Sequence, residues 1–133
     1  MEVTGNVLFV DKTLEQYQEE QIALIKQSFE TALAAGYTTS IISSITNQPI
    51  VVNSTPADTM NFQGAYQLAT AANLTNVTIC DFYNQLQTIT VQQLQTIVIE
   101  LITNTSQLYT KKWQLRNEIL AQTTPEGVLS IIW

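Results

Sequence analysis

Apolar residues recur at helical spacing in two long stretches of the chain. Between Leu14 and Ala35 they fall at intervals of three to five residues on one stripe, made of Tyr17, Ile22, Ile25, Phe29 and Leu33. A second stripe starts after Val91 and continues for roughly seven turns, through Leu94, Val98, Leu101, Leu108, Leu115 and Ile119. The two patterns predict two long helices, of which the first ends at Gly36.

The segments between these helices are rich in β-branched residues. "TTSIISSI" and "IVV", on either side of "TNQP", predict a β-hairpin within residues 38–53. "NVTICDF" and "LQTI", separated by "YNQ", predict a second one. A helix from about Pro56 to Ala72 lies between the hairpins, and Asn73 is its expected end.

Threonines occur where helices are expected to begin, namely at Thr13, Thr55, Thr90 and Thr123. Three residues after each lies a side chain that can accept a hydrogen bond from the cap's own amide: Gln16, Asp58, Gln93 and Glu126. Pro56 and Pro125 suit a first helical turn. The prediction is one α+β domain with about three long helices, a short C-terminal helix and two short β-hairpins.

Charge and composition exclude several functions. The net charge is −6 and the pI is about 4.3, which argues against a general nucleic-acid binder. There is no histidine, and Cys80 is the only cysteine, so the usual zinc and catalytic-thiol sites and an internal disulfide are absent. We expect Cys80 to be a small buried group in its strand. "MEVTGNVLFV" lacks the features of a signal peptide and "IVIELI" is too short to span a bilayer, so we expect cytoplasmic synthesis and no membrane.

The acidic residues do not form an evident catalytic or metal site. Glu15, Glu19 and Glu20 have the spacing of a solvated helix face rather than of a cation site. Asp81, near a hairpin tip, is interpreted as a turn residue that accepts backbone hydrogen bonds rather than as a general base. We therefore expect no catalytic residue, no cofactor, no metal and no enzymatic activity.

The stretch "LYTKKWQLRNEIL" concentrates basic residues around an aromatic one. Lys111, Lys112 and Arg116 surround Trp113. One interpretation is a nucleic-acid patch in which Trp113 stacks on a base. The favoured interpretation is structural: the helix macrodipole favours cations in this half, and their stems cover a buried Trp113 ring. The expected core residues of this region are Tyr109, Trp113, Leu115 and Ile119.

From about Thr46 to Leu129 the chain resembles an uncharacterised domain family of bacteriophage and prophage tail proteins. The segments that carry the resemblance are "TNQPIVVNSTPADTMNFQGA", "TICDFYNQLQTIT", "LYTKKWQLRNEI" and "AQTTPEGV". Ile79 and Cys80 depart from the family, which often has a tryptophan and a basic residue there. The resemblance implies that residues 37–133 form the phage-tail domain and that residues 1–36, a strand or arm with a helix, are an attachment element.

This resemblance implies a non-enzymatic structural protein of the virion tail that attaches or supports tail fibres near the baseplate. The alternative is a tail-fibre assembly chaperone that does not stay in the virion. Expected partners are tail-fibre and baseplate proteins and further copies of the chain, without nucleic acid. The low charged fraction, 12%, and the apolar ends of the chain favour burial in an assembly. The expected interface residues are Val7, Leu8, Phe9, Val10, Ile131, Ile132 and Trp133.

Overall fold

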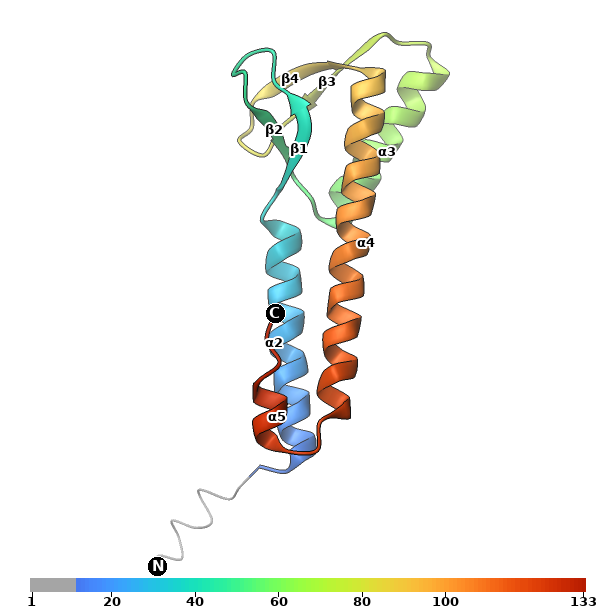
Figure 1. Ribbon diagram of the computed structural model, residues 1–133. Coiled ribbons are helices and arrows are strands. Elements are labelled where there is room, and N and C mark those ends of the chain that lie inside the picture. Colours follow the sequence, from blue (N-terminus) through green and yellow to red (C-terminus); the bar gives the residue numbers. More distant parts are fainter. Residues whose placement is uncertain (1–11) are drawn as a thin grey trace, which may run out of the picture. The chain divides into compact units, whose positions relative to one another are not determined.

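The computed structural model describes residues 12–133, which form four helices and two β-hairpins (Figure 1). In chain order the elements are α2 (Leu14–Ala34), β1 (Tyr37–Ile42), β2 (Pro49–Val52), α3 (Pro56–Ala71), β3 (Asn76–Cys80), β4 (Leu86–Thr90), α4 (Val91–Ala121) and α5 (Pro125–Leu129). The predicted α+β class, with three long helices, a short C-terminal helix and two hairpins, is confirmed. The expected N-terminal strand and the interface residues Val7–Val10 lie outside the described residues.

The described chain divides into two compact units. The first, here called the helical unit, contains α2 up to Phe29 together with Lys111–Trp133. The second, the hairpin unit, is Glu30–Thr110. This grouping brings together segments from the two ends of the sequence, whereas the predicted division between residues 36 and 37 followed sequence order.

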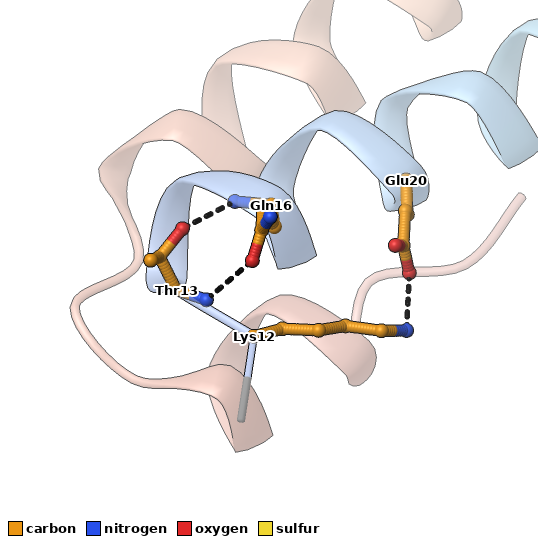
Figure 2. A network of polar contacts seen from close by, with 4 residues as sticks. All are labelled: Lys12, Thr13, Gln16 and Glu20. Carbon is orange, nitrogen blue, oxygen red and sulfur yellow. Dashed lines mark hydrogen bonds and ion pairs between the residues drawn. The ribbon is translucent and has the colours of Figure 1, made fainter. Parts of the chain in front are cut away.

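Helix α2 begins with the predicted capping box (Figure 2). The Gln16 amide donates to the hydroxyl of Thr13 over 3.1 Å, and the Thr13 amide donates to the side-chain oxygen of Gln16 over 2.8 Å. Next to this cap, the Lys12 ammonium donates to Glu20 over 2.7 Å. The hydrogen bond to Glu20 raises the pKa of Lys12 above its usual value. The two hydrogen bonds between Thr13 and Gln16 satisfy two N–H groups that a helix start leaves unpaired.

Two other helices begin with the same reciprocal pair, Thr55 with Asp58 in α3 and Thr90 with Gln93 in α4. The cap of helix α5 lies one residue later than predicted. Its cap is Thr124, whose hydroxyl accepts from the Gly127 amide, and not Thr123. Thr124 directly precedes Pro125, so the proline occupies the first helical position, where its missing N–H costs nothing.

The hairpin unit contains two antiparallel two-stranded sheets. Strands β3 and β4 pair in continuous register from Asn76 opposite Thr90 to Cys80 opposite Leu86. Strands β1 and β2 pair with an irregularity between Thr38 and Ile42. One face of each hairpin and the first half of α4 supply the core, which consists of Ile50, Val52, Ile79, Ile89, Leu94, Ile97, Val98 and Leu101.

A glycine permits the sharp exit from α2. Gly36 has φ +85°, a conformation that L side chains rarely adopt. A Cβ at this position would lie 2.7 Å from the Phe82 ring, so the site also demands a residue without a side chain. The same end of α2 is also held by Ser54. The buried hydroxyl of Ser54 donates to the Leu33 carbonyl over 2.7 Å and links the segment after β2 to the end of α2.

The helical unit has a core of its own, made by α2, the end of α4 and the C-terminal segment. Its buried members are Ile25, Ile119, Val128 and Ile131, with Leu14, Tyr17, Ile22, Leu115 and Trp133 packed around them. The Gln21 side chain, itself buried, donates to the Ile131 carbonyl over 2.8 Å. The Trp133 ring meets the Phe29 ring edge-on at 6.3 Å between centroids.

These contacts correct part of the interface prediction. Ile131 and Trp133 were expected to bind another chain, but Ile131 is buried in the core of its own unit and Trp133 packs against that core. Ile132 is exposed, as an interface residue would be. The prediction failed because Gln21 and Phe29, more than a hundred residues away, are what hold the segment.

The core residues predicted for the end of α4 are also only partly right. Ile119 is fully buried and Leu115 packs against it, while Tyr109 is half-buried. Trp113 is 47% exposed, so its predicted role as a buried anchor is wrong. Cys80 is exposed as well, because its side chain is on the outer face of β3, opposite to that of buried Ile79.

Candidate functional site

The tips of the two hairpins are joined by a chain of buried polar groups. The Ser43 hydroxyl donates to the side-chain oxygen of Gln87 over 2.8 Å. The Gln87 amide donates to Asp81 over 3.1 Å. All three side chains are buried, and the Phe82 amide adds a backbone bond of 2.8 Å to the Val51 carbonyl. Because each buried polar group has a partner, the two tips are fixed against one another.

Asp81 has the structural role that the sequence predicted. Its Oδ1 accepts from the backbone amides of Tyr83 and Gln85, over 2.9 and 2.8 Å, and thereby shapes the turn between β3 and β4. Its other oxygen accepts from Gln87, so both oxygens of the carboxylate are used in structural hydrogen bonds. The predicted role of Asp81 as a turn residue that accepts backbone hydrogen bonds is confirmed.

Large apolar side chains are exposed at the tips of both hairpins. Ile42 and Ile45, at the tip of the β1–β2 hairpin, are 54% and 67% exposed. Tyr83 and Leu86, at the tip of the β3–β4 hairpin, are 67% and 66% exposed. We call these four residues the hairpin-tip surface. Single exposed apolar residues are ordinary, whereas several large ones on the two tips of one unit are a candidate for protein binding.

A hollow lies between the two tips, with a volume of about 220 Å³. Thr46, Pro49, Tyr83 and Gln85 are among the residues that line it. Its volume is below the roughly 300–1,000 Å³ of typical small-molecule sites. A side chain of a partner protein fits it better than a substrate or cofactor does.

The charged side chains of the hairpin unit are all acidic. Residues 30–110 contain no lysine, arginine or histidine and four carboxylates, Glu30, Asp58, Asp81 and Glu100. Three of these carboxylates are used structurally, because Asp58 caps α3, Asp81 shapes a turn and Glu100 accepts from the backbone and hydroxyl of Ser40. Glu100 also interacts with the Tyr37 side chain, which lines the same pocket.

The structure places the remaining acidic candidates on the surface. Glu15, Glu19 and Glu20 are exposed, as predicted for a solvated helix face. In residues 12–133 no group of three or more potential metal-binding side chains comes together. Over the same residues, no helix has the length and apolarity that a bilayer crossing requires.

Comparisons with known proteins give a family and no established activity. Residues 16–132 match the family described as a domain of unknown function, DUF4376. The chain belongs to this family. The DUF4376 match includes both units and therefore the hairpin-tip surface. No curated protein and no solved structure matches the chain significantly.

Sequence reasoning missed the polar support of the hairpin tips. Gln87 and Ile89 are two residues apart on β4 and so face the same side, which the structure shows to be the buried one. A glutamine on the apolar face of a strand was the available signal, because a buried amide needs polar partners. Nothing in the local sequence indicates that Ser43, in the other hairpin, is one of them.

Proposed function

We propose that this DUF4376 protein is a non-enzymatic structural component of a bacteriophage tail, which attaches or supports tail fibres through the hairpin-tip surface. The observation that supports a binding role is the exposure of four large apolar side chains at the tips of two hairpins that are linked by buried hydrogen bonds. The phage setting rests on the sequence resemblance of residues 46–129 to tail proteins.

The expected strength of such a contact favours an assembly with many copies. Fully burying a large apolar side chain contributes about 1.5–3 kcal/mol. Four side chains that are already partly covered therefore offer about 4–7 kcal/mol before ordering costs. A contact of this strength is weak by itself and becomes durable when several copies bind together, as in a symmetric tail.

Particle incorporation tests the proposal. We expect the protein to stay with phage particles through purification, as detected by immunoblotting. Ile45→Asp and Tyr83→Asp should each remove it from particles, because burying an unpaired carboxylate at an interface is costly. Met60→Asp is the matched control, because Met60 is equally exposed on α3 and is not part of the hairpin-tip surface. Melting temperatures should be alike for all three variants.

A different pattern would support the alternative function. A wild-type protein that is absent from particles, but binds the fibre protein in infected cells through Ile45 and Tyr83, would be an assembly chaperone. Equal incorporation of all variants would remove the hairpin-tip surface from the proposal.

A further inference from the structure

A second candidate site lies in the helical unit, where the chain's cations gather. All five basic residues belong to this unit: Lys12, Lys26, Lys111, Lys112 and Arg116. Three of them, Lys26 from α2 and Lys112 and Arg116 from α4, line a pocket together with Ile22 and Ile25. We call these five lining residues the cationic pocket.

The cations of the pocket differ from Lys12 in their partners. Lys12 is neutralised by Glu20 at 2.7 Å. Lys26 and Arg116 form no ion pair with any residue of the described part of the chain, although this protein has more than twice as many acidic as basic residues. Lys112 lies over the Phe29 ring at 4.4 Å, which fixes its ammonium beside the pocket. Lys26 and Arg116 therefore place positive charge at the pocket that no carboxylate of the described residues neutralises.

We infer that the cationic pocket binds an acidic side chain of a partner protein, a carboxylate flanked by an apolar residue. The pocket floor is apolar, since Ile25 is buried and Ile22 is half-buried. An arginine fork binds a carboxylate through two parallel hydrogen bonds, and the two lysines add charge on either side. Trp113, three residues before Arg116 and 47% exposed, lies on the adjacent helix face and offers area for the apolar neighbour.

Charge complementarity favours a protein carboxylate over a nucleic acid. A nucleic acid is bound by a row of cations that follow successive phosphates. Here three cations converge on one pocket of about 150 Å³. Exposed carboxylates on the same two helices, at Glu15, Glu19 and Glu118, would repel an extended polyanion. A single carboxylate meets the cations and avoids that repulsion.

The test uses the full chain and two blocked peptides, acetyl-Leu-Asp-Leu-amide and acetyl-Leu-Asn-Leu-amide, which differ only in the charge. We expect amide NMR shifts at residues 22–26 and 112–116 on titration with the aspartate peptide. The asparagine peptide should bind at least about tenfold more weakly, as charged hydrogen bonds imply. Added salt should weaken the aspartate peptide selectively.

Variants separate the pocket from general electrostatics. Lys26→Glu and Arg116→Glu should each abolish the shifts. Lys12→Glu makes the same change in net charge outside the pocket and should leave them intact. Acetyl-Leu-Lys-Leu-amide should bind Arg116→Glu better than wild type, a gain that loss of folding cannot produce.

Three results would overturn the inference. The first is equal binding of the two peptides by the wild-type protein, and the second is an equal loss in Lys12→Glu. The third is a single-stranded oligonucleotide that binds the same residues more tightly than the aspartate peptide, which would make the pocket a nucleic-acid site.

Discussion

The two units of this chain satisfy their polar groups by opposite means. In the hairpin unit, which has no basic residue, carboxylates are held by amides and hydroxyls: Asp81 by Gln87 and two backbone N–H groups, Glu100 by Ser40. In the helical unit Glu20 is held by Lys12, and three further cations line a pocket. Three of the four carboxylates of the hairpin unit are thus held by uncharged groups, and this unit exposes apolar side chains at its tips, while the helical unit exposes charge.

The units also differ in how far apart in sequence their partners lie. The two hairpins of the hairpin unit pair strands that are neighbours in the chain. The helical unit joins residues 14–29 to residues 111–133, and its Gln21–Ile131 bond spans 110 positions. Closing such a long loop has an entropic cost before any contact forms. Core packing and buried hydrogen bonds must offset that cost in the helical unit.

The largest expected effect distinguishes core from surface in the helical unit. Ile119→Ala removes a fully buried side chain and should lower the free energy of unfolding by about 2–5 kcal/mol. Trp113→Ala should cost about 1 kcal/mol or less, because nearly half of its side chain is already exposed. Urea unfolding of both variants measures the difference. A larger loss for Trp113→Ala would restore the anchor role that the sequence suggested.

A smaller effect is expected from the polar link of the hairpin unit. Gln87→Ala leaves the Ser43 hydroxyl and one Asp81 oxygen without their partner, so the free energy of unfolding should fall by about 1–3 kcal/mol. Gln85→Ala is the control, because its side chain is exposed on the same hairpin and should change stability by less than about 0.5 kcal/mol. Equal stability of the two variants would mean that the buried link contributes nothing.

The same contrast explains which features the sequence could predict. The caps at Thr13, Thr55 and Thr90 are local, because both partners lie within four residues, and all three are as predicted. The positive φ of Gly36 at the end of α2 is a local feature too, whereas the Phe82 ring that also excludes a side chain there comes from a distant part of the chain. Helix bounds agree within about one or two residues for the same reason, whereas β1 ends at Ile42, three residues before the end of the predicted "TTSIISSI".

Burial of single residues could not be predicted where a distant segment decides it. Ile131 and Trp113 are both apolar and close to the C-terminus, yet one is buried and the other exposed. The favoured interpretation of the basic cluster placed the Trp113 ring in the core. The position of the C-terminal segment, held by Gln21 and Phe29, decided which side of α4 is covered. The link between Ser43 and Gln87, 44 positions apart, could not be predicted from the sequence for the same reason.

The smallest expected effect is a pH dependence of the stability, which arises from Tyr37 beside Glu100 in the hairpin unit. Burial, and then the charge and hydrogen bonding of Glu100, raise the pKa of Tyr37 above its usual value near 10. The folded chain therefore holds this proton more tightly than the unfolded chain, and the stability that it confers is present below about pH 10 and is lost as the pH rises through the folded-state pKa. Tyr37→Phe has no such proton.

We therefore expect Tyr37→Phe to be slightly less stable than wild type at about pH 8, where the contact with Glu100 is missing, and the gap to narrow at about pH 11. Urea unfolding of both proteins at the two pH values measures the gap. Tyr83→Phe, which removes a hydroxyl from an exposed tyrosine of the same unit, is the control substitution and is measured at the same two pH values. In the helical unit, the carboxylate of Glu20 is paired with a lysine, Lys12, and not with a tyrosine. Because its pKa is raised, Lys12 keeps its charge to a higher pH than an ordinary lysine does. A gap for Tyr37→Phe that does not change with pH would mean that neither burial nor Glu100 makes the folded chain hold the Tyr37 proton more tightly.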